Sequence, residues 1–213
     1  MSNKCSITIP KGYITGYSKV NKVAEASEEI HLGEGTHYLL ARNGRGKTTL
    51  LRTLAGSLKS LSGRAEVNGK LQFVPEDIFY DKSLNAKSIL NILIPRNRQE
   101  ECYSFAEKIE LDVHKPYRAL STGNQRKISW LMCEFSCVVE RGDVLLLDEP
   151  FTGLDSYVRE IMMEYWELNE DGICRLVSCH PDFDSMKIES SVLISDGFIT
   201  GVGTKELLSW GDL

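Results

Sequence analysis

A short glycine-rich loop places the strongest constraint on what this chain can fold into. Residues 41–48 read ARNGRGKT, and they match the template G-x-x-x-x-G-K-[ST] everywhere except at the first position, where Ala41 replaces glycine. The apolar run 38–40 precedes the loop and predicts a buried strand, and residues 49–55 predict a helix. Strand, loop and helix in this order are the context in which the template occurs in folded proteins.

The same loop predicts a site for phosphate groups. Backbone N–H groups of the loop and the positive end of the helix dipole point into one concavity, which favours an anion. We expect Lys47 to reach the β- and γ-phosphates of a nucleotide and the Thr48 hydroxyl to bind Mg²⁺. Gly46 lets the backbone approach the ligand closely, whereas the methyl group of Ala41 restricts φ. The candidate binding residues of this segment are Ala41, Arg42, Asn43, Gly44, Arg45, Gly46, Lys47, Thr48 and Thr49.

A second apolar segment ends in two carboxylates. Residues 144–147 read VLLL and precede Asp148 and Glu149. Four apolar residues in succession predict a buried parallel strand, and α/β sheets bind ligands at the carboxyl ends of such strands. We therefore expect Asp148 to hold Mg²⁺, largely through water, and Glu149 to orient and polarise a water that attacks phosphate.

Two further segments have features that suit an anionic ligand. Ser121 is a good N-cap and Gly123 removes bulk at the start of a predicted helix, which exposes donors to an anion. Most such helix starts only cap the helix. His180 follows a predicted strand at residues 175–178 and could hydrogen-bond a γ-phosphate, although a lone histidine is usually structural.

The N-terminal region predicts antiparallel β-structure, with strands at residues 6–9 and 29–32. Tyr17 lies in a predicted turn over residues 16–18, where its ring could stack on adenine. A tyrosine in such a turn more often only packs there, and Tyr13 is an alternative for the same role.

The rest of the chain alternates between hairpin and helical patterns. Strands at residues 64–67 and 71–74 flank Asn68-Gly69, a dipeptide typical of a hairpin turn. From residue 83 to 115 the pattern is helical and is broken at Pro95, which predicts a small helical subdomain. The remaining predicted elements are a helix at 157–168, a hairpin at 192–202 and a short helix at 205–210.

Charge and cysteine usage disfavour several classes of protein. The net charge of −5 disfavours a nucleic-acid binder that works by bulk charge, and equally a polybasic membrane anchor. No apolar run approaches the length of a membrane span, and residues 1–10 lack the pattern of a signal peptide. The six cysteines include no C-x-x-C pair, so we interpret them as small buried hydrophobes in a reducing cytosol.

The order of these segments resembles the ATP-binding subunit of ATP-binding-cassette (ABC) transporters over nearly the whole chain. The resemblance implies ATP and Mg²⁺ as ligands, and ATP hydrolysis with Glu149 and His180 as catalytic residues. The matching segments are 41–48 (Walker A), 120–124 (LSTGN for the LSGGQ signature), 144–149 (Walker B), 152–156 (D-loop), His180 (switch histidine) and Tyr17 (adenine-stacking aromatic).

Three positions depart from the family pattern. Ala41 replaces the first Walker A glycine, and Thr122 and Asn124 replace a glycine and a glutamine of the signature. Glu76 stands where the family has the glutamine of the Q-loop. A carboxylate there could still bind Mg²⁺, but it adds negative charge beside the γ-phosphate; Gln72 is a less suitable occupant because side chains alternate along a strand.

The resemblance also implies a fold and a division of the chain. The expected fold is α/β, a P-loop NTPase (RecA-like) core with an N-terminal antiparallel β subdomain and a small helical subdomain. Residues 1–76 would hold the β subdomain and Walker A, residues 77–141 the helical subdomain with the signature, and residues 142–213 the rest of the core.

The resemblance further implies partners and a location. Two copies would meet head to tail, each lending Ser121 and Gly123 to the ATP held by Lys47 of the other. The groove near residues 76–87 would seat a coupling helix of a separate permease, which places the homodimer at the cytoplasmic face of the cell membrane, without nucleic acid.

The short helical segment is most similar to the compact haem-exporter type, which favours export; small ATPases of protein or lipoprotein export are alternatives. Two other functions compete with a transport motor. One is a soluble ABC-type regulator that acts on ribosomes or DNA, although such proteins usually carry two cassettes or long coiled insertions. The other is an ATP-binding scaffold with very slow hydrolysis, which Ala41 and Glu76 suggest.

Overall fold

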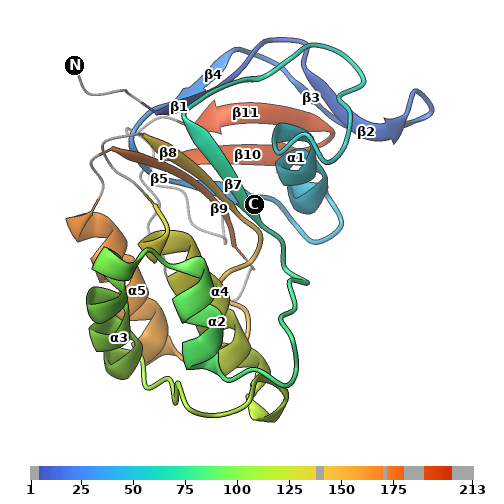
Figure 1. Cartoon of the computed structure of the whole chain (residues 1–213). Coiled ribbons are helices and arrows are strands. Elements are labelled where there is room, and N and C mark those ends of the chain that lie inside the picture. Colours follow the sequence, from blue (N-terminus) through green and yellow to red (C-terminus); the bar gives the residue numbers. More distant parts are fainter. Residues whose placement is uncertain (1–4, 138–141, 170–171, 180–189, 203–213) are drawn as a thin grey trace.

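The chain folds into two β-sheets and a group of helices, in a computed structural model that describes residues 5–137, 142–169, 172–179 and 190–202. Figure 1 shows α2, α3, α4 and α5 gathered at one end of the molecule and strands β1 to β4 at the other. In spatial order, the larger sheet contains β2 (Ile14–Ser18), β3 (Asn21–Ala26), β11 (Phe198–Val202), β10 (Ser191–Ser195), β5 (Gly35–Leu40), β9 (Ile173–Ser178), β8 (Asp143–Leu147) and β7 (Lys70–Val74). The smaller sheet contains β4 (Ile30–Leu32), β1 (Ser6–Ile9) and β6 (Glu66–Asn68).

Five strands of the larger sheet, β10, β5, β9, β8 and β7, run parallel and form the centre of the protein. Successive side chains of β8 enter two different cores, as the alternation of a strand requires. Val144 and Leu146 pack with helix α1 (Lys47–Leu54), and Leu145 and Leu147 pack with helices of the other face. Both faces of this strand are therefore covered, which explains its uninterrupted apolar sequence.

The predicted antiparallel β-structure near the N-terminus is confirmed. Strand β1 pairs antiparallel with β4 and with β6, and β2 pairs antiparallel with β3. The prediction of a turn at residues 16–18 is wrong, because Gly16 and Tyr17 belong to β2. Strand β2 has an irregular register at Gly16, where an added Cβ would lie 2.5 Å from the Asn21 carbonyl oxygen.

The predicted hairpin around Asn68-Gly69 is also wrong. Strand β6 pairs with β1 in the smaller sheet, while β7 pairs parallel with β8 in the larger one. Gly69 makes this separation possible, since its φ is +116° and an added Cβ would lie 2.3 Å from the Gly142 carbonyl oxygen. Asn68-Gly69 therefore connects a strand of the smaller sheet to a strand of the larger one. The local sequence does not encode which strands these two will pair with.

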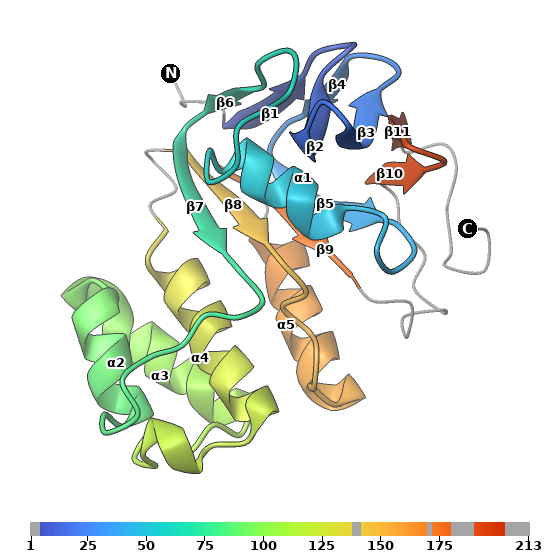
Figure 2. The same cartoon turned by 90° about the vertical axis from the view of Figure 1, so that its right-hand side faces the viewer.

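The predicted helical subdomain is present. It contains α2 (Ala86–Leu93), the 3₁₀ turn η1 (Arg96–Arg98), α3 (Gln99–Lys108), the turn η2 (Tyr117–Ala119) and α4 (Thr122–Phe135), and α5 (Ser156–Leu168) packs beside them. Asn85 caps α2 by accepting a hydrogen bond from the Ser88 N–H at 2.8 Å. Phe105 of α3 stacks on Trp130 of α4, with ring centroids 5.0 Å apart, and joins the two helices. Figure 2 shows α4 and α5 side by side.

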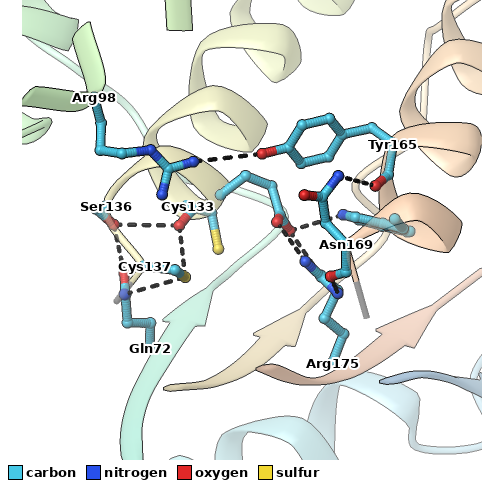
Figure 3. Close-up of polar contacts among 10 residues, drawn as sticks. Gln72, Arg98, Cys133, Ser136, Cys137, Tyr165, Asn169 and Arg175 are labelled. Carbon is cyan, nitrogen blue, oxygen red and sulfur yellow. Dashed lines mark hydrogen bonds and ion pairs between the residues drawn. The ribbon is translucent and has the colours of Figure 1, made fainter. Parts of the chain in front are cut away.

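A buried ion pair fastens α4 to the central sheet (Figure 3). Arg175 of β9 donates from Nε and Nη2 to the carboxylate of Glu134 on α4, at 3.1 and 2.9 Å. The Trp166 Nε1–H of α5 donates to the same carboxylate at 2.7 Å. Both charged side chains are at most 1% exposed, so the pair holds three elements together without contact with solvent.

Candidate nucleotide-binding site

The glycine-rich loop joins the end of β5 to the start of α1 at the carboxyl edge of the parallel strands. Gly46 has φ +107°, and an added Cβ would lie 2.2 Å from Val23 Cγ1, so only glycine fits there. The described non-glycine residues with positive φ are Glu110, Glu149 and Asp196. Ala41 is thus outside that region and is fully buried, which explains how alanine is accommodated at the first position of the loop.

A cavity of about 470 Å³ opens over this loop and brings together half of the predicted site residues. Lys47, Thr48 and Thr49 come from the start of α1, and Glu149 comes from the end of β8. The lining residues are Tyr17, Val23, Asn43, Gly44, Gly46, Lys47, Thr48, Thr49 and Glu149. Ala41, Arg42 and Arg45 line a second cavity, on the side of the loop that faces β10.

Lys47 supplies a buried positive charge to the first cavity. Its Nζ donates hydrogen bonds to the Ala41 carbonyl oxygen at 3.1 Å and to Asn43 Oδ1 at 3.5 Å. The same atom lies 3.6 Å from Glu149 Oε1. An ammonium group held by the loop backbone and facing a cleft is suited to an anionic ligand.

Asp148 is almost fully buried beside this cavity, and its two oxygens differ. Oδ1 accepts a hydrogen bond from the Ser178 hydroxyl at 2.8 Å, whereas Oδ2 has no hydrogen-bond partner in the described part of the chain. A buried carboxylate oxygen without a donor suits a hard divalent cation such as Mg²⁺. The chemistry of this oxygen therefore fits the cation that the sequence predicts.

Glu149 adopts an unusual backbone conformation, with φ +49°. Its N–H donates to the Ser178 Oγ at 2.9 Å, and the Thr152 hydroxyl donates to its Oε2 at 3.3 Å. Left-handed backbone at a bulky residue is rare and often marks a functional site. Sequence reasoning missed Ser178; the one signal was a polar residue at the carboxyl end of an apolar strand.

Tyr17 lies at the rim of the cavity. Its side chain is 63% exposed, and its hydroxyl lies 3.3 Å from Thr49 Oγ1. An exposed ring beside a phosphate-binding loop can stack on a planar ligand. Tyr13 is only 2% exposed and packs in the core, which excludes this alternative.

Glu76 does not line the cavity over the loop. It lines a different cavity, of about 380 Å³, together with Arg126 of α4. Arg126 Nη2 lies 3.5 Å from Glu76 Oε1, and the guanidinium also donates to the Glu76 carbonyl oxygen. Its predicted role as a Mg²⁺ ligand stays a prediction.

The start of α4 does not line the cavity over the loop either. Ser121 caps the helix by accepting from the Asn124 N–H at 3.2 Å. Gly123 packs against the loop that follows β8, and an added Cβ would lie 2.4 Å from the Gly153 carbonyl oxygen. His180 and the predicted helix at residues 205–210 lie outside the described residues.

The cysteines have the burial that the sequence predicts. All six, at positions 5, 102, 133, 137, 174 and 179, are buried free thiols. Burial raises the pKa of the Cys174 and Cys179 thiols to about 12. In the part of the chain that the structure describes, no group of three or more His, Cys, Asp or Glu side chains could hold a metal ion. No helix of that part is long and apolar enough to cross a membrane.

Comparisons with known proteins agree on one family. A sequence profile described as "ABC transporter" matches residues 24–152. A chain named uncharacterized ABC transporter ATP-binding protein MJ1023, from Methanocaldococcus jannaschii, is 34% identical over 78% of this chain and 66% of its own length. This chain thus spans less than two thirds of that relative.

Two further relatives are named for opposite directions of transport. The thiamine import ATP-binding protein ThiQ of Shigella flexneri is 28% identical over 80% of this chain and 82% of its own length. The cytochrome c biogenesis ATP-binding export protein CcmA of Zymomonas mobilis is 30% identical over 78% of this chain and 77% of its own length.

The fold has solved counterparts. A structure described as a putative ABC transporter (ATP-binding protein) from Pyrococcus furiosus superposes with a TM-score of 0.68. Its sequence is 21% identical, and the superposition covers 90% of this chain and 97% of the solved chain. The antiparallel strands, the parallel core with its phosphate-type loop and the small helical subdomain are thus the P-loop NTPase arrangement of ABC ATPases. Because the family profile matches more than half of the residues, the chain belongs to the ABC transporter family.

Proposed function

We propose that this protein is the ATP-hydrolysing subunit of a transporter that exports its substrate through a separately encoded membrane permease. The observation that carries the proposal is the cavity that joins Lys47, Thr48 and Tyr17 to Glu149. A cation for phosphate, a hydroxyl for the metal, a ring for the base and a carboxylate for the attacking water are the parts that phosphoryl transfer to water requires.

Each of these side chains has one task in the proposed reaction. Lys47 binds the β- and γ-phosphates, and Tyr17 stacks on adenine. Thr48 and Asp148 would hold Mg²⁺, with Glu76 as a further ligand. The bound cation would neutralise charge on the β- and γ-phosphates. Glu149 accepts the proton of the attacking water, and His180 hydrogen-bonds the γ-phosphate.

The proposed active form contains two copies of the chain. Ser121 and Gly123 lie outside the cavity that contains Lys47, although the resemblance assigns them to the nucleotide. A head-to-tail dimer resolves this, because each copy then presents its α4 N-terminus to the ATP of the other. ATP binding closes such a dimer, and hydrolysis reopens it.

The proposed permease contact lies between the core and the helical subdomain. Phe79 is 74% exposed, and it lines the cavity that also contains Glu76 and Arg126. We place the coupling helix of the permease in this groove, at residues 76–87. Through this permease contact the dimer would lie at the cytoplasmic face of the cell membrane. In this proposal, residues 1–76 and 142–213 form the core and residues 77–141 form the helical subdomain.

The direction of transport and the transporter subtype are the most detailed part of the proposal. The helical segment between Glu76 and Leu120 is short, and this compactness favours export of the haem-exporter type. The similarity to a chain named for cytochrome c biogenesis export supports it, and the similarity to a chain named for thiamine import is its competitor.

Phosphate release with Mg²⁺ and ATP tests the enzymatic part. We expect Glu149→Gln to lower turnover by about 100-fold or more, since it removes a general base, while leaving a nucleotide-bound dimer in sedimentation. Glu66→Gln, at an exposed position of β6, is the matched control and is expected to behave as wild type. Equal turnover in wild type and Glu149→Gln would remove Glu149 from its role.

Affinity purification from detergent-solubilised membranes tests the transport part. We expect an integral-membrane permease to co-purify with the tagged chain. Recovery of ribosomes or DNA instead would support the soluble regulator. Wild-type ATP binding with no measurable phosphate release would support the scaffold.

A further inference from the structure

Ser178 occupies a buried position beside Asp148 and Glu149, the two acidic residues of the site. It is the last residue of β9, which runs parallel to β8, and Val177 before it is the register partner of Leu147. Parallel neighbours end at the same edge of a sheet, so Ser178 meets the first residues after β8. Its side chain has no exposure to solvent.

One hydroxyl group serves both residues at once. Ser178 Oγ donates to Asp148 Oδ1 at 2.8 Å and accepts from the Glu149 N–H at 2.9 Å. A serine hydroxyl has one proton to donate and lone pairs to accept, so these two bonds are compatible. They direct the Asp148 carboxylate so that Oδ2 is the oxygen left without a partner in the described part of the chain.

The bond to Glu149 acts on a strained residue. Glu149 has φ +49°, and its carboxylate lies 3.6 Å from Lys47 Nζ. A left-handed glutamate is held only if its surroundings fix the peptide. The Ser178 hydroxyl supplies a fixed acceptor for that peptide N–H.

We propose that Ser178 is a positioning residue for ATP hydrolysis: its hydroxyl orients Asp148 toward the divalent cation and fixes the backbone from which Glu149 reaches the attacking water. This inference rests on the proposed function. Residues of the outer shell that orient a metal ligand typically change metal affinity or activity by about 10- to 100-fold when they are removed.

The test compares Ser178→Ala, which removes the hydroxyl, with Ser178→Thr, which keeps it. Ser191→Ala is the matched control, because Ser191 is buried in β10 of the same sheet and its hydroxyl has no partner in the described residues. Two readouts are used: ATP turnover, and the affinity of the ADP complex for Mn²⁺, a spectroscopic substitute for Mg²⁺, by electron paramagnetic resonance.

We expect Ser178→Ala to lower turnover and to weaken Mn²⁺ binding, each by about 10-fold or more, while ADP affinity measured in EDTA stays that of wild type. We expect Ser178→Thr to have wild-type turnover and Mn²⁺ affinity, and Ser191→Ala to change neither of these two quantities. If the alanine variant does not fold, Ser178→Cys keeps the size of the side chain with a much weaker donor and takes its place.

Unchanged turnover and Mn²⁺ affinity in Ser178→Ala would overturn the inference, and so would equal losses in the alanine and threonine variants. These outcomes differ from failure of the proposed function, in which the wild-type chain itself would bind no ATP or release no phosphate.

Discussion

Lys47 Nζ lies 3.6 Å from Glu149 Oε1, so the cation at the start of α1 and the carboxylate after β8 face each other across one cavity. The two side chains are 6% and 16% exposed, and water screens their attraction little. A phosphate that enters the cavity therefore meets both a binding charge and a repelling one, and it must draw Lys47 toward itself.

The first prediction concerns this lysine. We expect Lys47→Ala to weaken ATP binding by about 10- to 100-fold, since a charge-assisted hydrogen bond contributes about 1.5–3 kcal/mol. Isothermal titration calorimetry measures it. Lys22→Ala, at a lysine that is 43% exposed and paired with Glu25, is the control. Wild-type affinity in Lys47→Ala would show that phosphate binds elsewhere.

Tyr17 is expected to contribute through its ring. Stacking of a base on an aromatic side chain is worth about 1–3 kcal/mol, so Tyr17→Ala should weaken ATP binding by about 10-fold and Tyr17→Phe by much less. Tyr157→Ala, at a tyrosine of α5 that is 56% exposed, controls for the loss of a surface ring. Equal affinities in Tyr17→Ala and wild type would leave Tyr17 as an exposed residue of β2 with no part in nucleotide binding.

Glu76→Gln tests whether this carboxylate binds the metal. The Glu76 side chain is 49% exposed and Arg126 is 13% exposed, so water screens the pair from the Glu76 side, and we expect the free energy of unfolding to change by less than about 1 kcal/mol. If Glu76 is a ligand, an amide binds Mg²⁺ more weakly, and we expect the Mg²⁺ concentration for half-maximal turnover to rise a few-fold. An unchanged Mg²⁺ requirement would restrict Glu76 to its contact with Arg126.

The pair between Glu134 and Arg175 predicts a large effect on stability. Arg175→Met leaves the Glu134 carboxylate buried without its partner, and we expect a loss of about 3–5 kcal/mol in urea unfolding. The double variant Arg175→Met/Glu134→Leu should regain part of this loss, because no buried charge remains. Removal of the exposed Lys22 is the control, expected to cost less than about 1 kcal/mol.

Two buried thiols predict the dependence of stability on alkaline pH. Burial raises the pKa of Cys174 and Cys179 from 9.0 to about 12, so the folded chain keeps protons that the unfolded chain releases above pH 9. Their contribution is complete below pH 9 and is lost as the pH rises toward 12, by up to about 1.4 kcal/mol per thiol and pH unit.

We therefore expect the free energy of unfolding to decrease between pH 9 and 10. Cys179→Ala should make this decrease with pH less steep, by the amount that corresponds to about one released proton. Denaturant unfolding at pH 8, 9 and 10 measures both. A slope that is the same with and without Cys179 would show that this thiol ionises equally in the folded chain.

Local patterns predicted the parts of the protein whose contacts are local. The apolar run of β8 and the serine that caps α4 carry their own signals, and both elements formed where expected. Gly69 misled the prediction because the same dipeptide suits a hairpin and a passage between sheets. Ser178 was missed because its role depends on residues 29 and 30 positions away, which only the pairing of β8 with β9 brings near.

Gly123 and Gly153 lie so close together that their backbones pack directly against each other, with no side chain between them. A tilt of α4 would therefore press directly on the backbone of the loop that follows Glu149. The helical subdomain and the segment after Glu149 meet backbone to backbone here, because neither glycine carries a side chain.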